Sequence, residues 1–478
     1  MVSAVTFPRG RQFAVTWSIP DDFGGMTSAL LHRSRAFVRL AGAPVDVLTF
    51  DTRPDYPDLE RRLREQGELI DGLGIINLWD WLRANPVAAD AAGSLDLEKH
   101  AFTPLAADRA YVATKRGDTE LSRTRLAADG TTALQVDHYR EDGTLLASDR
   151  RDARTPGTLD GRSVVLCDVA GQPLRSFGGI WALYRFWLDL VRDREPSFMI
   201  VDSKTIATFM MTYVRKRAVI IHLVHSSHLS GTQRPIGELR ESRREVFENL
   251  GKWDSVVVLT DRQRTDVVAL LGPQPNLAVV PNGRDLDTPA LADRPVGAGI
   301  VLAALTSRKR VAHAIRAIAS APGATLDIYG DGEERAALEA LAGDTVKFHG
   351  HDRGARAKLA EASFLLLTSS SEGFPLVLVE AMAAGCLPIA YDVPYGPADI
   401  IRDGRNGFLV APGDEAGLSA AIRRLQSMSP RAVAKMRRDA QRTASDYSDL
   451  AVTKLWATAM RDADKRKAAE WARSHAVG

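Results

Sequence analysis

The chain has 478 residues, a formal net charge of +2 and 26% charged residues. This length exceeds what a single hydrophobic core ordinarily supports, so we expect at least two domains. The near-neutral charge excludes the strong basic field that is typical of a nucleic-acid-binding protein. The two cysteines exclude a disulfide framework and predict a reducing, cytoplasmic location.

The first 17 residues, MVSAVTFPRGRQFAVTW, contain no long apolar segment, so we expect no signal peptide. Apolar runs such as AVIIHLV at 218–224 have the length of a strand and are too short to cross a membrane. We therefore expect any membrane contact to be peripheral.

The N-terminal part begins as an α/β protein. Residues 11–19 predict a strand, followed by a Gly-containing loop and an amphipathic helix, and residues 43–51 predict a second strand. A strand–helix–strand unit of this kind is how a parallel sheet starts.

Residues from about 100 to 175 have a different pattern, with short alternating runs separated by turn dipeptides. Asp-Gly pairs between alternating runs predict two-residue hairpins. We therefore expect an antiparallel β-subdomain inserted into the first α/β domain. The predicted turns are Asp129-Gly130, Asp142-Gly143, Asp160-Gly161 and Ala170-Gly171.

Alternating helices and strands resume at 176–193 and continue to the end of the chain, interrupted by a segment rich in Pro, Gly and Asp. The fold class is α/β, with two Rossmann-like, doubly wound domains that bind a ligand at the carboxyl ends of their strands. The expected boundaries are a first domain at 1–285, a linker at 286–299, a second, ligand-binding domain at 300–445 and a helical tail at 446–478.

The segment SSSEGFPLVLVEAMAAGCLPIAYD at 369–392 is mostly apolar but contains two glutamates. Its pattern places Glu372 at a strand tip and Glu380 about one turn inside a helix that opens after Pro375. Free N–H groups at a helix start suit a phosphate, and a nearby carboxylate suits a ribose. The alternative is a helix with a capping serine and a buried structural glutamate.

Residues 369–414 resemble the C-terminal signature of retaining "group 1" glycosyltransferases, which have the GT-B fold. The resemblance implies that Glu372 contacts the donor sugar and that Glu380 binds the ribose. It also implies that the Gly373-Phe374-Pro375 backbone lies along the sugar and that the helix starting at Leu376 faces the diphosphate.

Two further segments resemble the same family. LDIYGDGEERAALEAL at 326–341 is similar to its strand–GxG–helix segment, and FGGMTSAL at 23–30 is similar to its glycine-rich loop. The second resemblance implies that Gly24 and Gly25 let the donor diphosphate or the acceptor approach the backbone. The alternative is a tight turn between strand and helix.

One position departs from the family pattern. Ala304 stands where the family has an arginine that clamps the diphosphate, whereas Lys309 occupies the position of the second clamping residue. Arg308 or Arg310 is the expected substitute, because a guanidinium reaches as far.

HLVHSSH at 222–228 places three histidines at the end of a strand. A metal site is one interpretation, but no carboxylate or cysteine nearby completes it, so we expect no metal. The resemblance implies instead that His225 points at the donor sugar, with His228 as a second candidate. The alternative is a set of histidines satisfied by backbone groups.

The whole-chain pattern is similar to poly(glycerol-phosphate) α-glucosyltransferases of wall teichoic acid and to related N-acetylglucosaminyltransferases. In such enzymes the insert supports oligomerisation or acceptor binding, so a homo-oligomer is possible. Basic clusters could contact a polyanionic acceptor, although such clusters are more often solvated helix faces. They are Arg215-Lys216-Arg217, Arg308-Lys309-Arg310 and Lys465-Arg466-Lys467.

The implied function is a retaining, metal-independent glycosyltransferase without a cofactor. It would move a hexose or N-acetylhexosamine from UDP-glucose or UDP-N-acetylglucosamine to a hydroxyl of a teichoic-acid-type polymer. Alternatives are a Ser/Thr-directed protein O-glycosyltransferase and a non-catalytic GT-B partner subunit, which only Ala304 favours. A nucleotide-dependent oxidoreductase is disfavoured because no GxGxxG follows the first strand.

Overall fold

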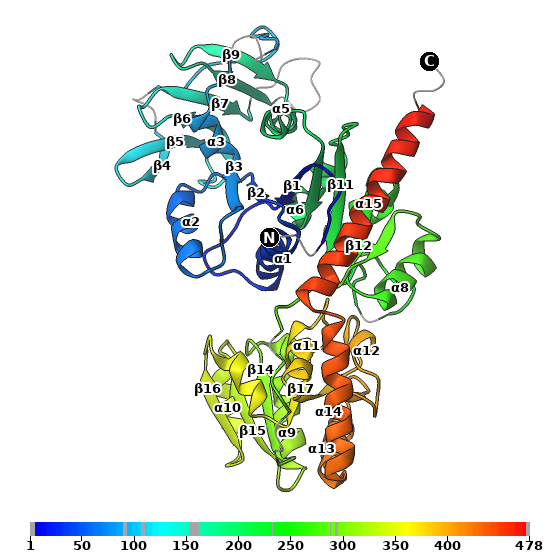
Figure 1. The fold of residues 1–478 in the computed structure, drawn as a ribbon. Coiled ribbons are helices and arrows are strands. Elements are labelled where there is room, and N and C mark those ends of the chain that lie inside the picture. Colours follow the sequence, from blue (N-terminus) through cyan, green and yellow to red (C-terminus); the bar gives the residue numbers. More distant parts are fainter. Residues whose placement is uncertain are drawn as a thin grey trace. The chain divides into compact units, whose positions relative to one another are not determined.

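The computed structural model describes residues 5–88, 93–106, 110–152, 162–231, 233–286, 288–291 and 295–474 (Figure 1). The chain forms two compact units. Unit 1 consists of Met1–Pro8, Ser28–Gly42 and Ile221–Gly478, and unit 2 consists of Arg9–Thr27 and Ala43–Ile220.

The N-terminal parallel sheet contributes four strands to unit 2, in the order β10-β1-β2-β3. Their hydrophobic sequences explain their burial: all five residues of β10 and four of the five in β1 are buried. The bounds are β1 Arg11–Val15, β2 Val45–Thr49, β3 Leu73–Asn77 and β10 Ser197–Val201. The helices of this unit are α2 Tyr56–Glu65, α3 Leu78–Ala84, α5 Ile180–Arg192 and α6 Lys204–Met211.

The insert is a six-stranded antiparallel meander in the order β4-β5-β6-β7-β8-β9. The turns at Asp129-Gly130 and Asp142-Gly143 lie between consecutive strands as predicted, with positive φ at both glycines. The predicted turn Asp160-Gly161 lies outside the described residues. The bounds are β4 Val112–Arg116, β5 Thr119–Leu126, β6 Ala133–Tyr139, β7 Leu145–Arg150, β8 Ser163–Cys167 and β9 Pro173–Phe177.

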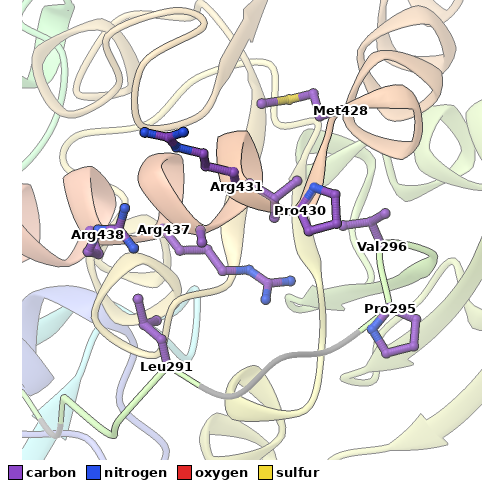
Figure 2. Close-up of a pocket in the computed structure, with 10 residues that line it drawn as sticks. Leu291, Pro295, Val296, Met428, Pro430, Arg431, Arg437 and Arg438 are labelled. Carbon is purple, nitrogen blue, oxygen red and sulfur yellow. The ribbon is translucent and has the colours of Figure 1, made fainter.

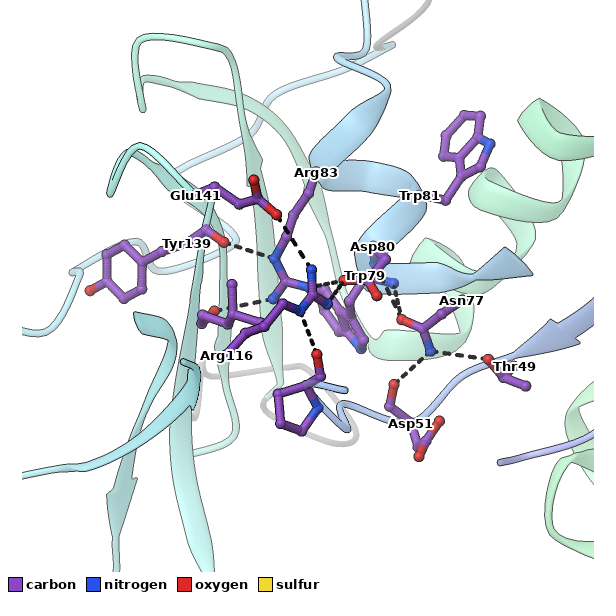
Figure 3. Close-up of polar contacts among 12 residues, drawn as sticks. Thr49, Asp51, Asn77, Trp79, Asp80, Trp81, Arg83, Arg116, Tyr139 and Glu141 are labelled. Carbon is purple, nitrogen blue, oxygen red and sulfur yellow. Dashed lines mark hydrogen bonds and ion pairs between the residues drawn. The ribbon is translucent and has the colours of Figure 1, made fainter. Parts of the chain in front are cut away.

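Polar contacts fix the insert to helix α3 (Figure 3). Arg83 of α3 donates hydrogen bonds to the carbonyl oxygens of Tyr139 and Leu121, at 2.9 and 3.2 Å. Asp80, one turn earlier, accepts from Arg83 at 2.9 Å and from Arg116 of β4 at 2.6 Å. Burial lowers the pKa of Arg83, partly offset by Asp80. The inserted sheet is therefore held by buried charge-assisted bonds, which are stronger than neutral ones.

Unit 1 holds the other three strands of the N-terminal sheet, in the order β13-β12-β11. They are β11 Ala218–Val224, β12 Ser255–Val258 and β13 Leu277–Val279. The surrounding helices are α1 Gly25–Ala41, α7 Glu241–Glu248, α8 Asp261–Leu271 and α15 Asp449–Ser474. Trp456 of α15 is almost completely buried and packs edge-on against Phe37 of α1.

The C-terminal sheet, also in unit 1, is parallel with the order β16-β15-β14-β17-β18-β19 (Figure 1). Its strand order reverses beside β14, where doubly wound sheets usually bind ligands. The strands are β14 Ala298–Leu302, β15 Thr325–Tyr329, β16 Val346–Gly350, β17 Phe364–Leu367, β18 Leu387–Tyr391 and β19 Phe408–Val410. The helices are α9 Val311–Ala319, α10 Arg335–Leu341, α11 Leu376–Ala383, α12 Pro397–Ile400, α13 Glu415–Ser427 and α14 Pro430–Ser445.

These elements confirm the predicted α/β class with an inserted antiparallel sheet. The sequence analysis placed no element between 52 and 99, where the structure has α2, β3 and α3. Of the predicted linker, residues 287 and 292–294 lie outside the described part of the chain. Across the described residues, none of the helices has the length and apolar character needed to span a membrane.

Candidate active site

Glu372 lies in the turn between strand β17 and helix α11, as the sequence predicts. The backbone of Glu372 pairs with the loop after β18: its N–H donates to Pro394 O at 3.1 Å, and its carbonyl accepts from Tyr395 N at 2.8 Å. Pro375 is the N-cap of α11, which begins at Leu376 as expected. This pairing fixes the direction in which the Glu372 side chain leaves the turn.

Glu372 is paired with the predicted cations. Its Oε1 lies 2.6 Å from Lys309 Nζ and 3.4 Å from Arg308 Nη1, and Arg308 also donates to Ser371 O at 2.9 Å. The Glu372 side chain is only 11% exposed, so this pairing offsets the cost of burying its charge. The Thr368 hydroxyl donates to Lys309 O at 2.9 Å and the Ser370 N–H donates to Arg308 O at 2.8 Å, and these two bonds hold the loops together.

Glu380 has a cationic partner that the sequence analysis missed. Arg284 Nε lies 2.7 Å from Glu380 Oε1, and Arg356 Nε lies 3.9 Å from the same oxygen. Arg284 follows β13, and its backbone pairs with Tyr447 and Asp449 at the start of α15. The signal that could have identified it is its position directly after the apolar segment NLAVVPNG at 276–283.

Gly373 lies against the end of β11. A Cβ at this position would lie 2.1 Å from the carbonyl oxygen of His225 and 3.4 Å from Ser226 Cα. Only glycine therefore allows this backbone contact. The structure thus brings together the predicted His225 and the Glu372-Gly373 turn. Phe374, next in the turn, is buried and its ring packs against Tyr447.

The backbone after His225 is surrounded by buried polar groups. Arg243 of α7 donates to Ser226 Oγ at 2.9 Å, and Gln263 of α8 donates to Ser226 O at 3.0 Å. Burial lowers the pKa of Arg243 to about 10, because desolvation disfavours the charged form. The sequence analysis identified neither residue, since both lie on helices without a recognisable motif.

His228 is completely buried, in contrast to His225, which is half-buried. Its ring stacks on Phe247 and on Tyr395, with centroids 5.2 and 6.1 Å away. Burial, reinforced by Arg234 and Arg243, lowers its pKa to about 4, so the ring is neutral near pH 7. Within the described part of the chain neither ring nitrogen has a hydrogen-bond partner.

The backbone beside Ala304, the position at which the family has an arginine, packs closely against Gly330. Ala304 itself is exposed, and a Cβ at Gly330 would lie 1.8 Å from Ala303 O. Among the described residues Arg310 has no hydrogen-bonded or ion-paired side-chain partner, whereas Arg308 reaches Glu372. Of the two substitutes considered for the missing arginine, Arg308 is the one beside the candidate site.

Gly24 and Gly25 belong to unit 2, where they line a cavity of about 440 Å³. A Cβ at either glycine would meet nothing within 4 Å, so open space lies in front of both. The other polar groups that line this cavity are Thr16, Ser18, Thr27, Ser203 and Thr205.

Another cavity, of about 670 Å³, lies at the start of α14 (Figure 2). It is lined by Arg431, Arg437, Arg438 and apolar side chains, and it includes none of the predicted site residues. Among the described residues there is no group of three or more His, Cys, Asp or Glu side chains that could hold a metal.

Comparisons with known families and proteins identify the domain that carries this candidate site. Residues 300–428 match the family "Glycosyl transferases group 1", so the chain contains a group 1 glycosyltransferase domain. A poly(ribitol-phosphate) α-N-acetylglucosaminyltransferase of Staphylococcus aureus is 22% identical over 83% of this chain and 89% of its own.

Two other relatives are covered only in part. A poly(glycerol-phosphate) α-glucosyltransferase of Bacillus subtilis is 26% identical over 50% of this chain and 37% of its own. An exopolysaccharide phosphotransferase of Streptomyces coelicolor is 40% identical, over 36% of this chain. Only 19% of that protein is covered, so its named activity is not transferred to this chain.

Solved structures show the fold. A Staphylococcus aureus TarM mutant, solved with Fondaparinux, α-GlcNAc-glycerol and UDP, has a TM-score of 0.66 at 18% identity, covering 95% of this chain and 100% of that one. The pneumococcal O-GlcNAc transferase GtfA, solved with UDP and GlcNAc, has a TM-score of 0.64 at 19% identity, covering 95% and 99%. The chain has the GT-B fold, as predicted.

Proposed function

We propose that the chain is a retaining glycosyltransferase that moves a hexose or N-acetylhexosamine from a UDP-sugar to a hydroxyl of a polyol-phosphate polymer. The observation that carries the proposal is the contact of the Glu372-Gly373 turn with the His225 carbonyl, beside the Lys309–Glu372 pair. Its support from relatives is the named activity of the teichoic-acid-type transferases and the UDP found in the TarM and GtfA structures.

In the proposed roles Glu372 orients the donor sugar, with His225 nearby, and Lys309 and Arg308 stabilise charge on the departing diphosphate. Glu380 binds the ribose, and the N–H groups at the start of α11 face a phosphate. Catalysis then consists of positioning and charge stabilisation, without a covalent nucleophile and without a metal. Gly24 and Gly25 leave room for the diphosphate or the acceptor.

The experiment is UDP release from a panel of UDP-sugars by the wild type, Glu372→Gln and Glu361→Gln. Glu361 is a matched control, because it is an exposed glutamate paired with Lys358 in the same domain. We expect one donor to be hydrolysed slowly by the wild type and the control, and activity to be lost in Glu372→Gln. Absence of release and of UDP binding with every donor would refute the enzyme and favour a non-catalytic partner.

Three features of the proposal are tested with the same preparation. The anomeric configuration of the product, determined by NMR, tests retention, and activity in EDTA tests metal independence. Sedimentation of the chain with and without residues 112–177 tests oligomerisation through the insert. Cys167 and Cys386 are buried and are not joined in a disulfide, which favours a cytoplasmic location, because thiols persist in a reducing compartment.

A second candidate acceptor is a Ser/Thr-rich protein, favoured by the likeness to the pneumococcal O-GlcNAc transferase. Offering the wild type a Ser/Thr-rich peptide and a poly(glycerol phosphate) chain, each with the active donor, distinguishes the two acceptors. Sugar transfer to the peptide alone would replace the polyol-phosphate proposal.

A further inference from the structure

A basic cavity of about 500 Å³ lies in unit 2, between strand β9 and helix α5. Strand β9 is the last strand of the inserted sheet, and α5 follows it directly in the chain (Figure 1). It is lined by four arginines and one carboxylate, together with two aromatic rings: Arg175, Arg185, Arg194, Arg215, Asp189, Phe177 and Phe186.

The Arg175 guanidinium packs against two aromatic rings. Its Cζ lies 5.0 Å from the centre of the Phe177 ring and 4.3 Å from that of Phe186. In the described part of the chain it makes no salt bridge, and burial lowers its pKa. Gly93 also lies close to this guanidinium, since a Cβ there would be 2.7 Å from Arg175 Nη1. A half-buried charge that is packed in this way has lost hydration, and aromatic rings repay only part of that cost.

The neighbouring arginines add to this charge. Arg185 donates to Thr212 Oγ1 at 2.7 Å, a neutral partner, and Arg194 is exposed with no ion pair among the described residues. Arg215 is the only one of the four with a carboxylate partner, Asp189, at 2.6 Å. Among the described residues, three guanidinium groups without a carboxylate partner therefore line one cavity, although the net charge of the whole chain is only +2.

We propose that this cavity binds consecutive phosphodiester groups of the polyol-phosphate acceptor and so holds the polymer on the inserted sheet. The inference rests on the proposed function, which it deepens by assigning an acceptor site. Each phosphodiester carries one negative charge, and a planar guanidinium can donate two parallel hydrogen bonds to its oxygens. A polymer of phosphodiester groups can bind several separate arginines at once, which a single carboxylate cannot do.

The sequence supports this assignment only in part. The basic run Arg215-Lys216-Arg217 is a candidate surface for a polyanion, but its first member is neutralised by Asp189. The charges without a carboxylate partner in the described part of the chain come instead from Arg175, Arg185 and Arg194, which are separated in sequence and are brought to one cavity by the packing of α5 against β9.

The test measures binding of fluorescein-labelled poly(glycerol phosphate) of defined length to the full chain by anisotropy, without donor. The variants are Arg175→Gln, Arg175→Lys and Arg175→Gln/Arg194→Gln. Arg61→Gln is the matched control, since Arg61 is an exposed arginine of unit 2 outside the cavity. UDP release without acceptor is measured in parallel and is expected to be unchanged in all of them.

We expect Arg175→Gln to weaken polymer binding about tenfold, with a further loss in the double variant and partial retention in Arg175→Lys. The dependence of affinity on salt is expected to become shallower by about one counterion per lost contact. Wild-type affinity in the double variant, or no binding of the polymer by the wild type, would overturn the inference. Equal binding of an oligodeoxynucleotide of the same charge would also overturn it.

The failure of this inference is distinguishable from that of the proposed function. If the wild type transfers sugar to the polymer but the variants bind it normally, the acceptor site is wrong and the function stands. If the variants lose polymer binding but the wild type transfers no sugar to it, the anion site is supported and the proposed acceptor is wrong.

Discussion

Gly373→Ala is the sharpest test of the candidate active site. The added Cβ would lie 2.1 Å from His225 O, whereas ordinary contact between carbon and oxygen needs a separation more than about 1 Å longer. Neither side of the contact is a flexible side chain, so the backbone of the turn or of the β11 end must move. Glu372, the adjacent residue, moves with it.

The expected loss follows from this displacement. A shift of about 1 Å in catalytic geometry costs about 100-fold in turnover, which corresponds to about 2.7 kcal/mol in the activation barrier. Overpacking of this kind is also expected to lower the free energy of unfolding by about 1–3 kcal/mol. Donor hydrolysis measures the first quantity and urea denaturation the second.

Gly343→Ala is the matched control, because a Cβ at Gly343 meets nothing within 4 Å. We expect the control to keep both its activity and its unfolding free energy. Gly373→Ala with wild-type turnover would refute the claim that this contact positions the site. If its stability fell but its activity at low temperature did not, the contact would be structural only.

Three further predictions concern the clamp, a buried histidine and a glycine. Arg308→Gln is expected to weaken UDP binding about tenfold in calorimetry, whereas Arg310→Gln should change it by less than about twofold, because of these two arginines Arg308 is the one that contacts Glu372. A larger loss in Arg310→Gln than in Arg308→Gln would assign the diphosphate contact to Arg310. His228 has a pKa of about 4 in the folded protein, whereas an unfolded chain takes up this proton near pH 6.5. The free energy of unfolding should therefore fall by about 3 kcal/mol between pH 6.5 and pH 4. His228→Phe should remove this dependence on pH. Gly330→Ala would place a Cβ 1.8 Å from Ala303 O at a positive φ, and we expect it to lower the unfolding free energy by about 3 kcal/mol; a normal urea midpoint would contradict this contact.

The sequence predicts elements well where one local pattern decides the structure. The Asp-Gly pairs require positive φ, and Gly130 and Gly143 adopt it. Likewise, α11 begins directly after its N-cap Pro375, where a proline costs no helical hydrogen bond because the first N–H groups of a helix have no partner within it. Both predictions depend only on the neighbouring residues.

Contacts between distant segments could not be predicted in this way. Arg284 and Glu380 are 96 positions apart, and no local pattern states that β13 ends opposite α11. Nor does a pattern show that Arg243 turns toward Ser226, since it lies on a short helix of ordinary amphipathic composition. These partners follow from how the elements pack, which periodicity does not specify.

The family resemblance contributed where periodicity failed. It indicated that His225 and Glu372 belong to one site, although each follows a strand of a different sheet. In the structure Gly373, next to Glu372, lies against the His225 carbonyl. It gave no guidance at Ala304, where this chain departs from the pattern. There the choice between two arginines depends on the contact of Arg308 with Glu372, which only the structure shows.

The two glutamates in an apolar segment now have a common explanation. Each carboxylate is 11% exposed and each has a cationic partner within 2.7 Å, Lys309 for Glu372 and Arg284 for Glu380. In the proposed complex the sugar and ribose hydroxyls would donate hydrogen bonds to the two carboxylates. Lys309 would then form its ion pair with the diphosphate instead of with Glu372. After this exchange each buried charge still has an ionic or hydrogen-bonding partner, which limits the cost of its burial with and without donor. The same exchange predicts how Glu372→Gln changes the affinity for UDP. The substitution removes the carboxylate that pairs with Lys309, so the lysine is available to the diphosphate. The variant should therefore bind UDP at least as tightly as the wild type while losing turnover.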